Sequence, residues 1–445
     1  MKLSLDPGDL DALILRIERA RASHARLYPG RQDVRQPVHT VCVPADRFTA
    51  ATARNWGDQA RRLLDDHAPD AATLGAAIGT GDQALVPVVR ERVADKLARE
   101  PVEDIRVDFE DGYGERGDAE EDDEVERVVG EVAAARDSGA LPPFWGVRIK
   151  SYAGGRHDRS IRTLDLFLTG LLERCEGRLP EGFVVTFPKV VMPEHVAVFA
   201  EVLARLEATL GLPEGALRFE IQVETPESIV NHHGEVGLRR IVDAAGPRLR
   251  SACFGVHDYT AACGLPPEAQ RLTHPACDVA RHIMQVTLAG TDVLLSDGST
   301  NVVPDGPGNA GWDADGDAGW DADGEARGNA VNAVWRVHAA HVRHSLRHGF
   351  YQGWDVHPSH LPARFGVVYA FHLAGLDQAA ARIRAWREGG GRAQGFGAAA
   401  GILDEPATIA ATLAKLRRAV DCGAVSEAEV RDRTGLPSLK SVELP

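Results

Sequence analysis

The sequence has few of the features that mark metal clusters, disulfide-rich proteins or membrane proteins. Only six of its 445 residues are cysteines, and none of them forms a C-x-x-C pair. A zinc cluster and a disulfide framework are therefore not expected, and the thiols should be buried and reduced. The chain has no apolar run of about 18 residues, and it carries acids near its start where a signal peptide would be basic. We expect a soluble, cytoplasmic protein without a membrane partner.

Positively charged residues are fewer than negatively charged ones. Lysine and arginine number 50 against 65 aspartates and glutamates, which gives a formal charge of −15. A protein that binds the phosphate backbone of nucleic acid would need the opposite sign over much of its surface. We therefore expect no nucleic-acid partner, while the hydrophobic content of 44% is enough for a large globular core.

Eight short runs of apolar and β-branched residues recur along the chain. Most are separated by stretches with helical periodicity, the clearest of which, residues 192–210, ends before Gly211. Strands that alternate with helices form a parallel sheet, and eight such units predict an α/β fold, a closed (β/α)8 TIM barrel. An open doubly wound sheet is the alternative. The runs span residues 38–46, 104–111, 144–151, 183–190, 217–225, 251–258, 291–298 and 353–359.

Three segments extend or interrupt the predicted barrel. We expect an N-terminal helical extension over residues 1–36, the catalytic barrel over 37–365 and a C-terminal helical region over 366–445. Within the barrel, an acidic low-complexity insertion at about 305–329 contains the repeat GWDADGDA-GWDADGEA. Its aspartates have the alternate spacing of a calcium loop, but alanine and glycine stand where that loop needs glycine and glutamate. We interpret the repeat as an acidic surface loop.

Ionisable residues follow nearly all of the predicted strands. In a barrel, the carboxyl ends of the strands line one mouth, where the active sites of this fold lie. Burying so many charges without a role is costly, because each has to be paired or coordinated. We therefore predict an active site at this mouth. In chain order, the strand ends carry Glu110 and Asp111, Arg148, Lys189, Glu224, Asp258, Asp297 and His357.

Three of these residues suggest the chemistry of the site. Glu224 and Asp258 end successive predicted strands, and two oxygen ligands without a local His or Cys cluster favour Mg²⁺. Arg148 offers a planar fork that suits a carboxylate or a phosphate. A metal ion beside an arginine predicts a site for a 2-oxo acid or an acyl thioester, in which the metal stabilises the enolate formed when a carbon–carbon bond is made or broken.

The other ionisable residues leave alternatives open. Glu110 or Asp111 could contact metal-bound water or act as general base, or could only cap the glycine turn that follows. We expect Lys189 to act as an electrophile or in an ion pair rather than through an imine, because the surrounding acids would keep its pKa high. His257 would point away from Asp258 in a regular strand and is left out of the site.

Six motifs in one order carry a resemblance to a known family. DFEDG, VRIKS, FPKV, VETPES, GVHDYTAACG and DVHPSHL, between about Val38 and Leu361, resemble the motifs of the HpcH/HpaI aldolase and citrate lyase beta-subunit family. The resemblance implies a magnesium-dependent (β/α)8 barrel of the phosphoenolpyruvate/pyruvate superfamily that assembles as a homotrimer or homohexamer. It also implies that Glu224 and Asp258 are metal ligands and that Arg148 binds the substrate.

Three functions remain open from the sequence. The first is a carbon–carbon lyase, or its reverse, that acts on a beta-hydroxyacyl-CoA such as malyl- or citramalyl-CoA. The second is an aldolase that forms pyruvate or another 2-oxo acid without coenzyme A, and the third is a barrel that has lost catalysis and serves as a binding component. The basic segment 148–162 could receive the phosphates of coenzyme A or could pair with the protein's own acids. The predicted catalytic residues are Glu110, Asp111, Arg148 and Lys189.

Overall fold

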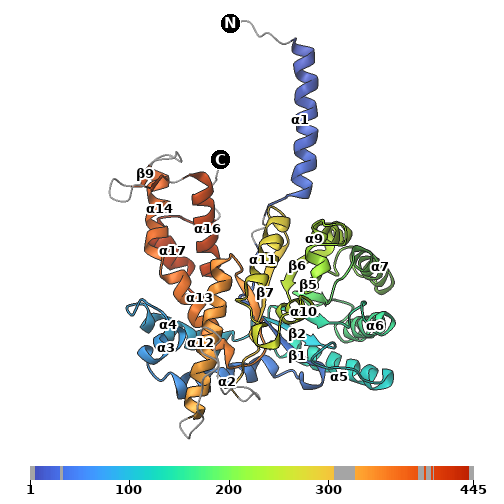
Figure 1. Cartoon of the computed structure of the whole chain (residues 1–445), viewed down its shortest axis with the longest axis horizontal. Helices are drawn as coiled ribbons and strands as arrows, with labels where there is room; N and C mark the ends of the chain where they lie inside the picture. The colour runs from blue at the N-terminus through green and yellow to red at the C-terminus, as the bar shows by residue number, and fades with distance from the viewer. Residues whose placement is uncertain are drawn as a thin grey trace.

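A closed barrel of eight parallel strands forms the centre of the molecule (Figure 1). The computed structural model describes residues 6–30, 34–304, 326–388, 395–396, 402–403 and 405–439. Consecutive strands pair in order, and β8 pairs back onto β1. The (β/α)8 prediction is confirmed, and the open sheet is excluded. The strands are β1 (His39–Pro44), β2 (Asp104–Asp108), β3 (Phe144–Arg148), β4 (Phe183–Phe187), β5 (Phe219–Val223), β6 (Leu249–Phe254), β7 (Leu294–Ser299) and β8 (Gln352–Asp355).

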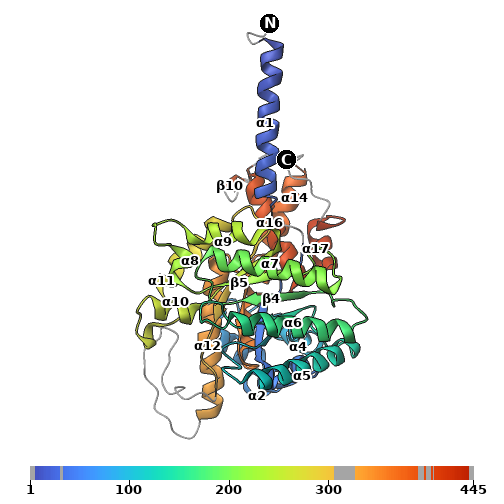
Figure 2. The ribbon, with the colours of Figure 1, turned by 90° about the vertical axis from the view of Figure 1, so that its right-hand side faces the viewer.

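Helices connect consecutive strands and cover the outside of the barrel (Figures 1 and 2). The predicted acidic insertion at 305–329 lies between β7 and β8; residues 305–325 are outside the described residues, and residues 326–329 begin a helix. In chain order the connecting helices are α2 (Thr52–His67), α3 (Ala71–Ile78), α4 (Val86–Arg99), α5 (Asp118–Asp137), α6 (His157–Arg174), α7 (Pro193–Leu210), α8 (Pro226–Ile229), α9 (Gly237–Ala245), α10 (Val256–Ala262), α11 (Pro275–Leu288) and α12 (Ala326–Arg347).

The helix predicted at residues 192–210 shows how the local sequence sets an element. The structure has this helix as α7, with Val196, Phe199 and Leu203 buried at helical spacing. It ends at Gly211, whose φ of 71° lies in the left-handed region that glycine adopts without steric cost. The apolar face and the terminal glycine therefore fix both the orientation and the end of this helix.

The interior of the barrel is polar near its amino-terminal end. Arg106 of β2 pairs with Asp104 of the same strand and with Glu220 of β5, at 3.2 Å from Nε to Oε1. Because β2 and β5 are not neighbours, this contact crosses the inside of the barrel. Thr186 of β4 and Ser251 of β6 donate hydrogen bonds to the two oxygens of Glu220. The buried charges are thus paired and hydrogen-bonded, as burial requires.

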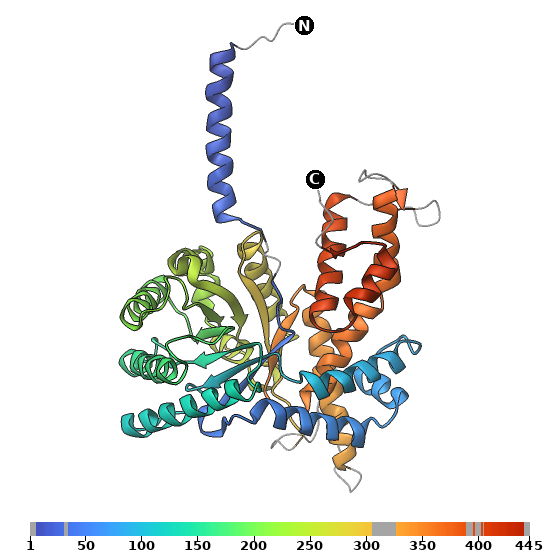
Figure 3. The same cartoon turned by 180° about the vertical axis from the view of Figure 1, so that it is seen from behind.

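A second hydrophobic cluster follows the barrel. Helix α13 (His360–Leu373) packs into the barrel core and crosses the boundary predicted at residue 365. Beyond it, a separate cluster forms between helices that stand beside the barrel in Figure 3. These helices are α14 (Leu376–Glu388), α16 (Pro406–Asp421) and α17 (Glu427–Thr434), with the short strands β9 (Gly395–Phe396) and β10 (Ile402–Leu403) between the first two.

The N-terminal helix α1 (Pro7–Leu27) projects away from the barrel (Figures 1 and 3). Its apolar residues Leu13, Ile14 and Ile17 are 44%, 47% and 64% exposed. None of the described helices is both long enough and apolar enough to span a membrane.

All six cysteines lie in the described part of the chain and are free thiols, so the expectation of no disulfide framework is confirmed. Burial of every thiol was a wrong expectation. Cys263 is exposed and Cys42 is only partly buried.

Candidate active site

A cavity of about 410 Å³ opens at the carboxyl ends of the barrel strands. Seven of the eight strands contribute to it, directly or through the residue that follows, as the (β/α)8 fold predicts for an active site. Of the predicted site residues, Asp111, Arg148, Glu224 and Asp258 line this cavity, whereas Glu110 and Lys189 line an adjoining one of about 290 Å³ together with Asp111. The strand-end lining residues are Pro44, Asp108, Arg148, Glu224, Phe254, Gly298 and Trp354.

Arg148 is held by Asp108, a residue that sequence reasoning missed. Its Nε and Nη2 donate to the two carboxylate oxygens of Asp108 at 2.7 and 2.6 Å, and both side chains are nearly buried. The remaining nitrogen, Nη1, lies 3.3 Å from Glu110 and 3.5 Å from Gln222. The guanidinium also lies 5.6 Å from the centre of the Trp354 ring. Arg148 is therefore fixed in orientation, with Nη1 as the nitrogen that Asp108 leaves available.

Asp108 also sets the loop that follows β2. Its carboxylate accepts hydrogen bonds from the backbone N–H groups of Glu110 and Gly112, at 2.9 and 2.8 Å. The turn-capping role that the sequence suggested for Glu110 or Asp111 thus belongs to Asp108. The signal was the trio of carboxylates in DFED, of which the first lies within the strand and faces the barrel mouth.

Lys189 pairs with both acids of this loop. Its Nζ lies 2.7 Å from Glu110 and 2.7 Å from Asp111. Burial alone would lower the pKa of Lys189, but hydrogen bonds to Asp111 and Glu110 raise it above its ordinary value. A charged lysine is a poor imine-forming group, so the ion-pairing role is the one that the geometry supports.

The backbone of Lys189 also reaches the predicted metal ligands. Its φ of 48° lies in the left-handed region, which is uncommon for a residue with a side chain. In this conformation its N–H donates to Oε1 of Glu224 at 2.6 Å. Strain of this kind persists only where the surroundings fix it and is frequent at functional sites. Lys189 thereby links the acids after β2 to the glutamate after β5.

Glu224 and Asp258 fit a divalent cation. Glu224 is 3% exposed, and Gly255 leaves room for its carboxylate, since a Cβ at Gly255 would lie 2.4 Å from Oε2 of Glu224. Burial and the nearby negative charge of Asp258 raise the pKa of Glu224 to about 8, against the opposing effect of Arg148. Two carboxylates close enough to repel one another would both be stabilised by a hard cation such as Mg²⁺.

The sequence suggested that Asp258 ends a strand, but the structure places it in a helix. Strand β6 stops at Phe254, and Asp258 lies in the first turn of α10. The argument that excluded His257 by strand alternation therefore fails. His257 lines the same cavity, and its Nε2 is buried without a hydrogen-bond partner among the described residues. Burial lowers the pKa of His257, which favours the neutral ring.

Two other predicted members of the mouth do not line the cavity. Asp297 is fully buried, where Arg281 donates to it at 2.9 Å and Ser345 at 2.6 Å. It supports the packing of helices on β7 rather than the site. His357 contacts Ser359 through Nδ1 at 2.8 Å, and its neighbour Val356 lines the cavity instead. The predicted ring of charges was therefore wrong at β7 and β8.

The basic segment 148–162 pairs largely with the protein's own acids. Lys150 lies 3.2 Å from Glu121 of α5, and Arg159 and Arg162 lie 2.7 and 2.6 Å from Asp122. Arg156, which lines the adjoining cavity, makes only longer ion pairs of 3.5 and 3.9 Å. The geometry favours the ion-pair interpretation for most of this segment.

Fold and site together define a class of protein: a closed parallel (β/α)8 barrel whose mouth holds an arginine and a pair of carboxylates suited to a divalent cation. A model of the family described as a domain of unknown function, DUF6986, matches residues 17–443. The chain belongs to this family.

The chain is also similar to three other proteins. A stretch of 94 residues is 39% identical to L-malyl-CoA/beta-methylmalyl-CoA lyase of Haloarcula marismortui, which is 21% of this chain and only a quarter of that enzyme's length. A citrate lyase from Burkholderia xenovorans LB400 superposes with a TM-score of 0.54 and 18% identity, over 80% of this chain and 94% of that one. Haloferax volcanii malate synthase gives a TM-score of 0.45 and 14% identity, over 93% and 98%. The likeness to citrate lyase confirms the barrel fold that the sequence motifs predict.

Proposed function

We propose that the protein is a Mg²⁺-dependent carbon–carbon lyase, or the corresponding condensing enzyme, that acts on a beta-hydroxyacyl-CoA such as malyl- or citramalyl-CoA. The observation that carries the proposal is the placement of Glu224, Asp258 and Arg148 around one cavity at the barrel mouth. The local identity to a malyl-CoA lyase supports the thioester as substrate.

Each of the residues around the cavity has its own role in the proposed reaction. Glu224 and Asp258 would hold Mg²⁺, which when bound polarises a carbonyl oxygen as a Lewis acid. Arg148 binds the substrate carboxylate through Nη1, while Asp108 keeps the guanidinium plane fixed. Trp354 lines the same cavity and packs its ring against the guanidinium of Arg148.

Cleavage requires a base that takes the proton of the beta-hydroxyl group before the carbon–carbon bond breaks. The candidates are Glu110, which lines the adjoining cavity, and His257, which lines the main cavity. Burial and the nearby Asp111 raise the pKa of Glu110, although Arg148 and Lys189 oppose this, and a raised pKa suits a carboxylate for proton transfer near neutrality. His257 offers an unpartnered ring nitrogen at the cavity.

A second candidate function is an aldolase that forms pyruvate or a related 2-oxo acid without coenzyme A. The ion pairs of the basic segment favour it, because Lys150, Arg159 and Arg162 are already engaged by acids of α5 and are not free to bind phosphates. In this alternative, Glu224, Asp258 and Arg148 keep the same roles.

Assembly and location are part of the proposal. We infer a homo-oligomer, a trimer or hexamer as the motif resemblance implies, and the apolar residues that α1 exposes, among them Leu13, Ile14 and Ile17, offer a surface for contacts between copies. A cytoplasmic location agrees with six free thiols.

Calorimetry on the metal-free protein tests the function. We expect binding of Mg²⁺ first, and then binding of pyruvate, oxaloacetate or acetyl-CoA only when Mg²⁺ is present. Saturable binding of acetyl-CoA would support the thioester substrate, and binding of the 2-oxo acids alone would support the aldolase. Ligand binding that does not depend on Mg²⁺ would contradict both, and would leave a barrel that binds without catalysis.

A further inference from the structure

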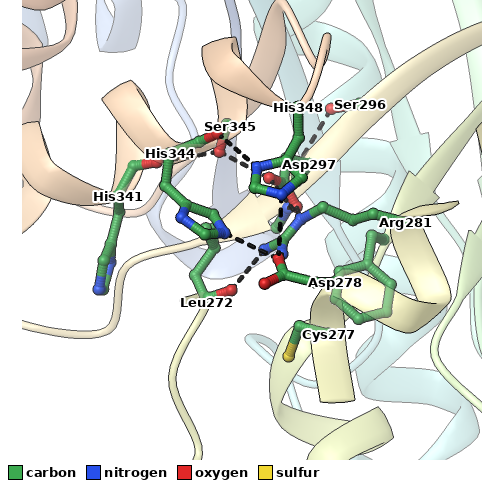
Figure 4. Close-up of polar contacts among 12 residues, drawn as sticks. Leu272, Cys277, Asp278, Arg281, Ser296, Asp297, His341, His344, Ser345 and His348 are labelled. Atoms are coloured by element: carbon green, nitrogen blue, oxygen red, sulfur yellow. Dashed lines mark hydrogen bonds and ion pairs between the residues drawn. The ribbon is translucent and has the colours of Figure 1, made fainter. Parts of the chain in front are cut away.

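Asp278, His344 and His348 form a cluster of side chains that could hold a metal ion (Figure 4), and none of them lines the cavity at the barrel mouth. Asp278 comes from α11 and His344 from α12, and His348 directly follows Arg347, the last residue of α12. Nε2 of His344 lies 2.8 Å from Oδ1 of Asp278, and Nε2 of His348 lies 3.7 Å from the same oxygen. All three side chains are 23–33% exposed, so an ion from solvent can reach them.

The two histidines are spaced for joint ligation. Residues four apart lie on the same face of a helix, so the rings of His344 and His348 stand one turn apart, with centroids 4.3 Å from each other. Nδ1 of His348 lies 3.0 Å from the backbone oxygen of His344, which can only accept a hydrogen bond. In the neutral ring this fixes the proton on Nδ1 and leaves the lone pair on Nε2, which faces Asp278.

From this arrangement we propose that Asp278, His344 and His348 form a second cation site, for Zn²⁺ or a similar borderline divalent ion. Bonds of about 2.0–2.1 Å at tetrahedral angles place ligand atoms about 3.3 Å apart, between the two distances observed here. Two imidazoles and one carboxylate suit zinc better than magnesium, and water completes the fourth position.

Arg281 contacts the same carboxylate oxygen of Asp278, Oδ1, that faces the two histidines. Its Nη1 donates to Oδ1 of Asp278 at 2.6 Å, while its Nε pairs with the buried Asp297 of β7 at 2.9 Å. Ligating carboxylates are commonly held by such a second hydrogen bond, which orients them for the metal. A bound ion would thus connect α11 and α12 to each other and, through Arg281, to β7.

A similar group inside the protein is not a competing site. His338, Asp355 and His360 also lie close together, but they are fully buried. Asp355 already accepts hydrogen bonds from Arg364 and pairs with His39 at 2.9 Å. Its charge is neutralised by protein groups, and solvent does not reach it.

Titration of the full-length protein with Zn²⁺ in the presence of saturating Mg²⁺ tests the proposal. We expect one Zn²⁺ per chain in the wild type and in Glu224→Gln, so the result does not depend on the site at the barrel mouth. His344→Ala and His348→Ala should each weaken binding by about 10–100-fold or more. The matched control is His282→Ala, which removes an exposed histidine of α11 outside the cluster and should bind like the wild type.

Two further measurements keep the test decisive if a variant folds poorly. X-ray absorption of the wild-type zinc complex should show two imidazoles and no sulfur in the first shell. Thermal unfolding should move to higher temperature with Zn²⁺ in the wild type and in His282→Ala, but not in His344→Ala or His348→Ala. Sulfur ligation, or unchanged zinc affinity in folded His344→Ala and His348→Ala, would overturn the assignment.

Discussion

Gly255→Ala tests the placement of Glu224 without touching its carboxylate. The backbone of Gly255, at φ −98° and ψ 97°, accepts alanine without strain, so the effect of the change is steric. The new Cβ would lie 2.4 Å from both Cβ and Oε2 of Glu224. Since carbon atoms pack at about 3.5–4.0 Å, the glutamate has to move by roughly 1 Å.

The magnitude follows from that displacement. A misplacement of about 1 Å at a reacting group can cost about 10²-fold in rate, and overpacking of a buried site costs about 1–3 kcal/mol of stability. We therefore expect Gly255→Ala to weaken Mg²⁺ binding and to lower kcat/KM for malyl-CoA cleavage about 100-fold, while the protein still folds.

Calorimetry with Mg²⁺, a thioester-cleavage assay and urea unfolding measure the three effects. The control is Gly130→Ala in α5, where an added Cβ has no atom within 4 Å and alanine should stabilise the helix by up to about 1 kcal/mol. Wild-type affinity for Mg²⁺ in a folded Gly255→Ala protein would refute the assignment of Glu224 as a ligand.

Four other predictions concern ligands, substrate, pH and assembly. Glu224→Gln and Asp258→Asn should each abolish Mg²⁺ binding seen by calorimetry while circular dichroism stays unchanged; activity at the wild-type level in either would place the metal elsewhere. Arg148→Lys should raise KM about 10- to 100-fold in steady-state kinetics, because a charged hydrogen bond contributes about 1.5–3 kcal/mol; a loss confined to kcat would contradict a role in substrate binding. Burial lowers the pKa of His372 to about 3, so the stability that its neutral ring gives is complete above pH 6.5 and is lost as the pH falls below that value. Urea unfolding should then show that the free energy of unfolding falls by roughly 1 kcal/mol per pH unit below pH 6.5, and that His372→Gln removes this dependence. The same slope in His372→Gln as in the wild type would show that the ring is not buried in solution. Light scattering should give the mass of a trimer or hexamer that falls in Leu13→Asp/Ile17→Asp, and a wild-type monomer would disprove the proposed assembly.

The barrel was predictable because its signals are local. Each strand is a short apolar run, and helix ends such as Gly211 are marked by the residue itself. Strand order in a closed parallel barrel then follows from chain order, so the mouth and the positions of Arg148 and Glu224 could be predicted before the structure.

The features that could not be predicted depend on contacts between residues that are far apart in the sequence. Asp297 and Arg148 both follow apolar runs, but one meets Arg281 of a packed helix and the other meets Asp108 of the neighbouring strand. The start of α10 at Val256 could not be recognised because the apolar run continues through Gly255. The predicted strand therefore extended to Asp258, and strand alternation placed His257 on the wrong face. Local sequence patterns do not predict which residue a buried charged side chain pairs with.

The pairing of β1 with β8 has a consequence for how copies of this chain can meet. Every strand of the barrel has a hydrogen-bonded neighbour on both sides, so no unpaired backbone edge is offered to another molecule. The barrel sheet therefore cannot pair with a strand of another molecule, and it cannot start edge-to-edge aggregation. Copies of the barrel can join only through helices and loops.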